Sequence, residues 1–288
     1  MLRVFCDGMT TEPRLAHPEG VAVHRDGSVW CGGELGQIYR IAPDGTTREV
    51  VVSTGGFCLG LAFDAADNLF VCDLAHAAVF RLDSRTGALD RFAGGAGGHR
   101  FTTPNFPAFD AAGRLYVSDS GTAGTAGPGI FRFGPDGDGE LWHPGPFEFA
   151  NGLAFDAECR TLYVAETWRH AISAIEVRAD GSPGTRSDLA VLPGVLPDGL
   201  AVAADGAVYV GCYEPSQIMR VAAGREPEIV AADPTAHLLC HPTNIAFRDT
   251  TLISANLGRW HLTAVAAGVP GVPLPPTPPT PPVPPVGR

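Results

Sequence analysis

One pattern recurs six times along most of the chain, and no other feature restricts the fold as strongly. Each copy has a short apolar stretch, a polar turn and a second run of alternating apolar and polar residues. Aligned on the second residue of each copy, the intervals are 40, 46, 46, 47 and 45 residues. This period is typical of β-propeller blades. The copies begin at Pro18, Cys58, Pro104, Ala150, Pro197 and Pro242.

Most copies predict four strands. In the fourth copy the apolar stretch 152–155 and the run 162–165 form the first hairpin. A more polar outer strand follows the third strand, as at 47–52 in the first copy. Six such units predict an all-β, six-bladed propeller with four-stranded blades. Third strands are expected at 37–41, 78–82, 129–133, 172–175 and 217–221.

The two ends of the repeat region predict how the ring closes. The last copy supplies only three strands and ends near 262–265, whereas a spare strand, Arg3–Cys6, precedes the first copy. We expect this strand to become the outermost strand of the sixth blade, which removes an exposed sheet edge. The propeller domain is then 1–267, and 268–288, which contains ten prolines, is expected to be a disordered, polyproline-II-like tail.

Composition excludes several function classes. The chain has 288 residues, 31 acidic and 20 basic, and the formal net charge of −11 argues against nucleic-acid or anionic-membrane partners. The start MLRVFCDGMTTEP lacks the apolar core of a signal peptide. The seven cysteines form no C-x-x-C pair and are expected to be reduced. We expect a cytoplasmic protein, monomeric or weakly dimeric.

The second residue of each copy is the candidate ligand position. The innermost strands of a propeller begin around one mouth of the central channel, so these six positions meet in space. Four of them carry oxygen ligands, and two carboxylates with two amides suit a hard divalent cation. Alternatively, these side chains cap strand starts or form Asx turns, but turn formation should then favour turn residues in all six copies. The six residues are Glu19, Leu59, Asn105, Asn151, Asp198 and Thr243.

The strings PEGVAV, PNF, NGLAFD with LYVAET, and PDGLAVAADG resemble the family of senescence marker protein (regucalcin), gluconolactonase and luciferin-regenerating enzyme. The resemblance covers about residues 2–265. It implies a six-bladed propeller with one divalent cation and sugar-lactone hydrolysis. It also implies that Glu19, Asn151 and Asp198 are metal ligands, that Asp198 is the general base, and that Asn105 faces the substrate.

The resemblance implies that the ion is usually calcium or zinc; we expect calcium here, with zinc, manganese or magnesium as alternatives. A cation polarises the lactone carbonyl, and Asp198 orients or deprotonates the attacking water. The chain departs from the family around Asn105, because Thr103 and Phe106 stand where many members have an arginine and an aspartate. A less polar lactone is therefore plausible as the substrate. Arg100 replaces the missing guanidinium only if its glycine-rich loop folds over the mouth.

Aromatic residues and histidines near the inner strands are further candidates for the pocket. Trp168 and Tyr213, together with Trp260, follow strands of the fourth to sixth copies and are candidates for the substrate wall, although blade packing explains aromatics equally well. His241 and His261 are nearby but are expected to be packed or exposed. The string Gly56–Gly60 matches a nucleophile elbow around Cys58, but it falls in phase with the repeat. Besides hydrolysis, a non-hydrolytic metal-assisted reaction and a non-catalytic binding scaffold stay open.

Overall fold

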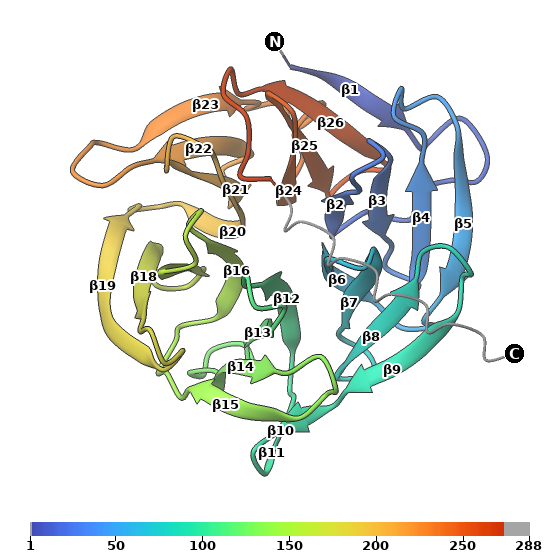
Figure 1. Ribbon diagram of the computed structural model, residues 1–288. Coiled ribbons are helices and arrows are strands. Elements are labelled where there is room, and N and C mark those ends of the chain that lie inside the picture. Colours follow the sequence, from blue (N-terminus) through green and yellow to red (C-terminus); the bar gives the residue numbers. More distant parts are fainter. Residues whose placement is uncertain (1, 274–288) are drawn as a thin grey trace, which may run out of the picture.

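The computed structural model describes residues 2–273, and these residues form six four-stranded antiparallel sheets arranged in a ring (Figure 1). The prediction of a six-bladed, all-β propeller is confirmed. The described residues contain no helix long and apolar enough to cross a membrane. Blade 1 consists of β2 (Val21–Val23), β3 (Val29–Gly32), β4 (Gln37–Ile41) and β5 (Arg48–Ser53). Blade 2 consists of β6 (Cys58–Phe63), β7 (Asn68–Asp73), β8 (Ala78–Asp83) and β9 (Leu89–Ala93).

The remaining blades repeat this order from the channel outward. Blade 3 consists of β12 (Pro104–Phe109), β13 (Leu115–Asp119), β14 (Gly129–Phe133) and β15 (Gly139–His143). Blade 4 consists of β16 (Ala150–Phe155), β17 (Thr161–Glu166), β18 (Ala171–Val177) and β19 (Pro183–Val191). Blade 5 consists of β20 (Leu196–Val202), β21 (Val208–Glu214), β22 (Gln217–Val221) and β23 (Glu228–Ala232). Blade 6 consists of β24 (Pro242–Arg248), β25 (Thr251–Asn256), β26 (His261–Ala266) and β1 (Leu2–Asp7).

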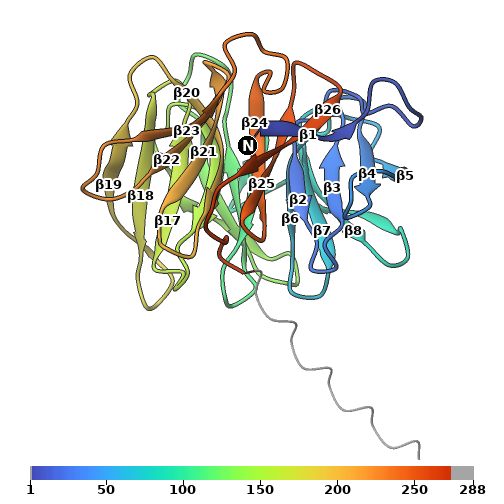
Figure 2. The ribbon, with the colours of Figure 1, turned by 90° about the horizontal axis from the view of Figure 1, so that it is seen from above.

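Strand β1 closes the ring as predicted. It pairs antiparallel with β26, with Leu2 opposite Val265 and Arg3 opposite Ala264. Figure 2 shows β1 lying across β26 at the rim, so that the sixth blade combines the two ends of the repeat region. The outer edge of β26 is therefore covered by another strand of the same chain.

The hydrophobic core lies between neighbouring blades. Phe106 of β12 and Tyr116 of β13 share one apolar cluster with Ala150 and Leu153 of β16, which belong to the next blade. The alternating residues of each strand supply these contacts from both faces of a sheet, because successive side chains point to opposite faces. Packing between blades leaves the starts of the inner strands free to line the channel.

A bulge at the start of the inner strands frees the candidate ligand position from the ladder. In β16 the pairing runs from Ala150 opposite Glu166 directly to Leu153 opposite Val164, and blades 2, 3, 5 and 6 show the same shift. Bulges of this kind redirect a side chain. The skipped residues are the second and third of each copy, so the bulge acts on the position aligned in the sequence.

Glycine at the third position lets neighbouring inner strands touch. A Cβ on Gly152 would lie 2.3 Å from the carbonyl oxygen of Asp198, and one on Gly20 would lie 2.0 Å from that of Leu59. These distances leave no room for a side chain. The inner strands of these neighbouring blades are therefore in backbone contact near the mouth.

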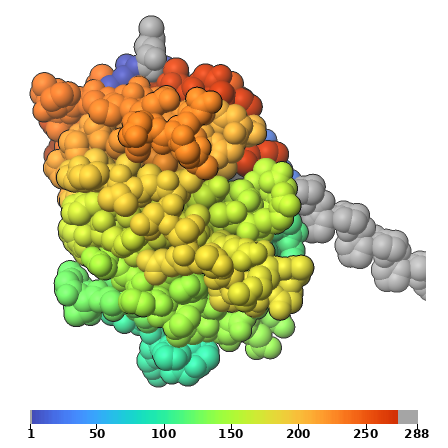
Figure 3. Space-filling model, turned by 90° about the vertical axis from the view of Figure 1, so that its left-hand side faces the viewer, coloured from blue at the N-terminus to red at the C-terminus, as the bar shows by residue number. Residues whose placement is uncertain are grey.

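Two segments differ from the sequence prediction. The glycine-rich loop forms a hairpin, β10 (Gly95–Ala96) with β11 (His99–Arg100), that packs against β14 and β15 and projects from the outside of blade 3 (Figure 3, teal). Residues beyond the predicted domain boundary at 267 also contact blade 5. The backbone nitrogen of Ala204 donates to the carbonyl of Pro270 (2.8 Å), and that of Val272 donates to Val202 (2.9 Å). Proline lacks a donor but keeps its acceptor. The rest of the predicted tail, 274–288, lies outside the described residues.

Candidate metal centre

Four buried oxygen atoms without hydrogen-bond partners come from the aligned inner-strand position. Each of the four side chains that carry them is between 3% and 6% exposed. A buried oxygen without a donor is costly, because it has lost its contacts with water. The four oxygens are all acceptors, so a positive charge between them would satisfy the whole set. They are Glu19 Oε2, Asn105 Oδ1, Asn151 Oδ1 and Asp198 Oδ1.

The pKa values of the two carboxyl groups, Glu19 and Asp198, are both raised. Burial raises the pKa of Glu19 well above its usual value, and the negative charge of Asp198 raises it further. Burial raises the pKa of Asp198 to about 7, with partial compensation from the Asn151 side chain. Both ionised forms are disfavoured without a counter-charge. A divalent cation would supply that counter-charge.

The donor set fits an ion that prefers oxygen. Among residues 2–273, no cluster of three or more His, Cys, Asp or Glu side chains could hold a metal. The set here has only two carboxylates, and amide oxygens complete it. Carboxylate and amide oxygens are the ligands that calcium and magnesium prefer. Zinc sites more often use cysteine and histidine.

The backbone around Glu19 is fixed from the sixth blade. Its carbonyl accepts hydrogen bonds from the Thr243 hydroxyl (2.7 Å) and from the Asn244 nitrogen (3.3 Å). At its aligned position, Thr243 therefore has a structural role, because its hydroxyl holds the backbone of Glu19. Leu59 is 6% exposed and belongs to an apolar cluster with Phe70 and Phe101. The two positions that interrupt the ligand set thus have apolar or structural roles.

Asn244 is a buried polar residue that the sequence prediction missed. It is fully buried, and neither amide atom of its side chain has a hydrogen-bond partner. It occupies the third position of its copy, where Gly20, Gly152 and Gly199 stand in other copies. An asparagine in a glycine position is the sequence signal that could have identified it.

Trp168 and Tyr213, the aromatic residues predicted for the substrate wall, lie at the end of the blades where the inner strands begin. Burial raises the pKa of Tyr213, and the charges of Glu19 and Asp198 raise it further. Trp168 follows β17, is 46% exposed, and packs against Phe149 with ring centroids 5.5 Å apart. Both side chains are available to a ligand at the mouth.

The histidines near the mouth are anchored. The His241 ring stacks on Tyr213 at 4.5 Å, and its Nδ1 lies 3.0 Å from Glu214 Oε1. His261 Nε2 contacts the carbonyl of Leu238 at 3.0 Å. Trp260 packs against His17, with ring centroids 4.7 Å apart. Packing thus accounts for most contacts of these rings.

The structure does not bring Arg100 to the site. Arg100 is exposed on β11, at the outside of blade 3, because the glycine-rich segment folds back on itself and not over the mouth. Phe106 is buried between blades 3 and 4. Thr103 donates its backbone nitrogen to Asp119 (2.9 Å). None of these three positions places a charged group beside Asn105.

Cys58 cannot act as the nucleophile of an elbow. Its side chain is fully buried, and burial raises the pKa of the thiol to about 12. A thiol with this pKa is not a nucleophile at neutral pH. The glycines around it belong to the propeller repeat.

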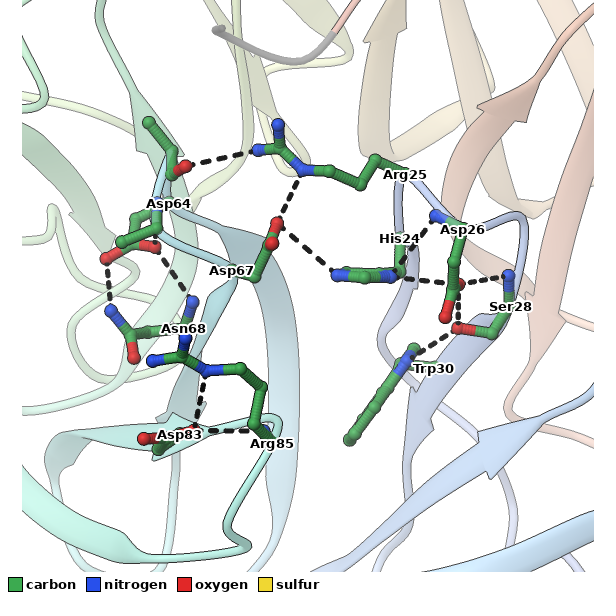
Figure 4. A network of polar contacts seen from close by, with 12 residues as sticks. His24, Arg25, Asp26, Ser28, Trp30, Asp64, Asp67, Asn68, Asp83 and Arg85 are labelled. Atoms are coloured by element: carbon green, nitrogen blue, oxygen red, sulfur yellow. Dashed lines mark hydrogen bonds and ion pairs between the residues drawn. The ribbon is translucent and has the colours of Figure 1, made fainter. Parts of the chain in front are cut away.

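The opposite end of the inner strands is built differently (Figure 4). There Asp64 accepts hydrogen bonds from the nitrogens of Ala66 and Asn68, both at 2.8 Å. Asp26 accepts from the nitrogen of Ser28 at 2.8 Å and from its hydroxyl at 2.6 Å. These aspartates form Asx turns. The Asx-turn interpretation considered for the ligand position therefore applies to this end of the blades.

Comparison with known proteins agrees with this architecture. The chain is similar to the solved structures of a gluconolactonase from Xanthomonas campestris (22% identity, 94% of this chain and 89% of that chain, TM-score 0.76) and of luciferin-regenerating enzyme (15%, 96% and 99%, 0.74). It is also similar to virginiamycin B lyase from Staphylococcus aureus (14%, 92% and 99%, 0.65). These likenesses show the fold.

The sequence comparison is more specific. No curated protein matches the chain. The family described as SMP-30/Gluconolactonase/LRE-like region, however, matches residues 36–252, which is most of the propeller. The chain is therefore a member of the SMP-30/gluconolactonase/LRE-like family.

Proposed function

We propose that the protein is a divalent-cation-dependent hydrolase of a small lactone. The observation that carries this proposal is the set of four buried oxygens without donors at one mouth of the channel. Family membership supports a lactonase-type activity. A non-catalytic scaffold would not need acceptors beside a mouth with exposed aromatic side chains.

Glu19, Asn151 and Asp198 would hold the ion, and Asn105 would present a fourth oxygen to the ion or to the substrate. Calcium is the first choice because all donors are oxygens, with magnesium, manganese and zinc as alternatives. When bound, the cation polarises the lactone carbonyl and stabilises negative charge that develops on its oxygen. Its charge also removes the cost of ionising Glu19 and Asp198.

Asp198 would act as the general base. Its carboxylate takes a proton from water as the water oxygen bonds to the lactone carbonyl carbon. The ring C–O bond then breaks, and the proton passes from Asp198 to the ring oxygen that leaves as an alcohol. The product is an open-chain hydroxy acid. Tyr213, at the end of β21 that pairs with the start of β20, would hold a polar end of the substrate.

The surroundings of Asn105 favour a lactone with fewer hydroxyl groups than an aldonolactone. Thr103 uses its backbone nitrogen within blade 3, Phe106 is buried, and Arg100 lies outside the ring. These positions therefore offer no charged partner for sugar hydroxyls. Trp168 and Phe149 offer an apolar contact at the mouth.

The experiment that tests the proposal measures proton release from a panel of aldonolactones and aliphatic lactones. Chelator-treated protein is titrated separately with calcium, magnesium, manganese and zinc, and Asp198→Asn serves as the inactive control. We expect ion-dependent hydrolysis that is fastest with calcium and favours the less polar lactones. Ion binding without hydrolysis of any lactone would overturn the proposal and favour a non-hydrolytic reaction or a scaffold.

A further inference from the structure

Each of the two site amides is hydrogen-bonded to a buried hydroxyl. Asn105 donates from Nδ2 to Ser120 Oγ at 3.0 Å, and Asn151 donates from Nδ2 to Thr167 Oγ1 at 3.2 Å. Both hydroxyl residues are at most 5% exposed. Water is therefore not a competing partner for these hydroxyls.

Each hydroxyl in turn donates to the next blade. Ser120 Oγ donates to the carbonyl of Ala150 at 2.7 Å, and Thr167 Oγ1 donates to the carbonyl of Pro197 at 2.8 Å. Ala150 and Pro197 immediately precede Asn151 and Asp198 in the chain. Each hydroxyl thus connects an amide of one blade to the backbone beside the ligand position of the next.

This arrangement determines which way each amide points. A hydroxyl has one hydrogen, and here that hydrogen is used on a backbone carbonyl. The hydroxyl can then only accept from the amide, so the NH2 group must face it. The opposite rotamer would place the amide oxygen against the lone pairs of the hydroxyl oxygen. The amide oxygen is left pointing away, and in both residues this oxygen is the atom without a partner.

A residue with an aliphatic hydroxyl occurs at this position only in the blades that have asparagine at the ligand position. The residue that corresponds to Ser120 and Thr167 carries an aliphatic hydroxyl only in blades 3 and 4, which are the two blades with asparagine at the ligand position. A carboxylate needs no hydroxyl to orient it, because both of its terminal atoms are oxygens. In blades 1, 2, 5 and 6 the corresponding residues are Glu34, Leu74, Tyr213 and Leu257.

We infer that Ser120 and Thr167 are positioning residues that fix the oxygens of Asn105 and Asn151 toward the cation. This inference rests on the proposed function, because it assumes that the oxygens meet a cation. The two hydroxyls would not touch the ion or the substrate. They would raise ion affinity by removing the amide rotamer that points a nitrogen into the site.

Ser118 provides a matched control. Its hydroxyl is fully buried, donates to the carbonyl of Asn151 at 2.7 Å, and accepts from the nitrogen of Phe106 at 3.0 Å. It therefore links blades 3 and 4 as Ser120 does, but it makes no hydrogen bond with an amide side chain. Ser118→Ala removes a bond between blades and leaves the orientation of both amides unchanged.

The test is calcium titration of chelator-treated protein by calorimetry, with urea denaturation to confirm folding. We expect Thr167→Val and Ser120→Ala to raise the calcium Kd by about 10–100-fold, the range typical of lost outer-sphere partners of metal ligands. Thr167→Ser keeps the hydroxyl and should restore the parent affinity. Ser118→Ala should bind calcium as the parent does, although it loses a hydrogen bond between blades.

Three outcomes would overturn the inference. Equal affinity of Thr167→Val and the parent would show that the hydroxyl does not orient the amide. An equal loss in Ser118→Ala and Thr167→Val would show that contact between blades matters and amide orientation does not. If the folded parent binds no divalent cation, the proposed function fails as well, and this result is distinct from the other two.

Discussion

The two ends of the inner strands carry the same kinds of polar residue in opposite environments. At the turn end, Asp26, Asp64 and Asp110 accept two or more hydrogen bonds each from their own turns. At the mouth, Glu19 and Asp198 are buried, at 5% and 6% exposed, but each keeps an oxygen that no donor reaches. Residue type alone therefore does not distinguish a turn from a ligand site. The presence or absence of local donors does.

The pKa values of the acidic residues at the two ends also differ because of local hydrogen-bond donors. At Asp205, on the turn end, burial would raise the pKa, but hydrogen bonds from the nitrogen of Ala207 and from Arg220 lower it overall. At Asp198 burial is the main effect, and the pKa is raised to about 7. The turn end thus stabilises its charges by itself, whereas the mouth needs a charge from outside.

Asp198→Asn should have the largest effect on activity. We expect turnover to fall by roughly 10²–10⁴-fold, the usual contribution of a general base. The cation-free variant should unfold at an equal or higher urea concentration than the parent at pH 8, because it no longer buries a charged carboxylate. Lactone hydrolysis and urea denaturation check the two expectations. Unchanged turnover would remove Asp198 from the mechanism.

Glu19→Gln should mainly weaken ion binding. We expect the calcium Kd to rise by more than about tenfold, because affinity for calcium depends on the charge of the ligand set. The control is Glu34→Gln, which removes the same charge from a side chain of blade 1 that is 43% exposed. Calorimetry on both variants separates the two roles. A similar affinity loss in the two variants would indicate a general effect of charge, and Glu19 would not then be a ligand.

Asp110→Ala should affect stability and leave function unchanged. Asp110 accepts hydrogen bonds from the nitrogens of Ala112 (2.9 Å) and Arg114 (3.0 Å), and from Arg114 Nε (2.6 Å). Losing hydrogen bonds to a buried charged group should lower the free energy of unfolding by about 2–3 kcal/mol. Urea denaturation measures this loss. A large change in calcium affinity would show that the two ends of the strand are not independent.

The last expected effect is a pH dependence of the stability of the cation-free protein. The pKa of Asp198 is about 7 in the folded chain against a usual value of 3.8, so the folded state binds more protons between these pH values. The free energy of unfolding should therefore decrease as pH rises from about 4 to about 7. Urea midpoints in the presence of chelator should show a shallower slope for Asp198→Asn. Parallel slopes would contradict the burial of an unpaired carboxyl group at this position.

The repeat made most of the fold predictable. The period of about 45 residues predicts the number of blades. The spare strand at Arg3–Cys6 predicts the closure that β1 makes with β26. The third strands expected at 37–41 and 217–221 coincide with β4 and β22. Repetition works here because each unit must pack against its neighbours in the same way, so one alignment describes all of them.

Segments that do not repeat were harder to predict. The hairpin of β10 and β11 occurs once, and its glycines gave no indication of which way it folds. The packing of Pro270 and Val272 against blade 5 also occurs once, and it uses backbone groups that composition does not reveal. Both features depend on contacts between segments far apart in the chain.

The site was predictable in part. Alignment of the inner strands identified Glu19, Asn105, Asn151 and Asp198, because their spacing places them on equivalent strands. Ser120 and Thr167 stand in phase immediately after the second strands of their blades and could have been found by the same alignment. Their importance depends on which atom donates to which, and only the geometry of the hydrogen bonds shows this.

The closure of the ring by β1 also has a consequence for how the chain folds during synthesis. Strand β1 leaves the ribosome before the other strands of the ring, but its partner β26 is made after all of blades 1–5. During elongation β1 therefore has no native partner, and blade 6 cannot be completed until the end of the repeat region has emerged. A ribosome stalled before residue 261 would hold a nascent chain with an open ring and an unpaired strand at its beginning, a state prone to aggregation.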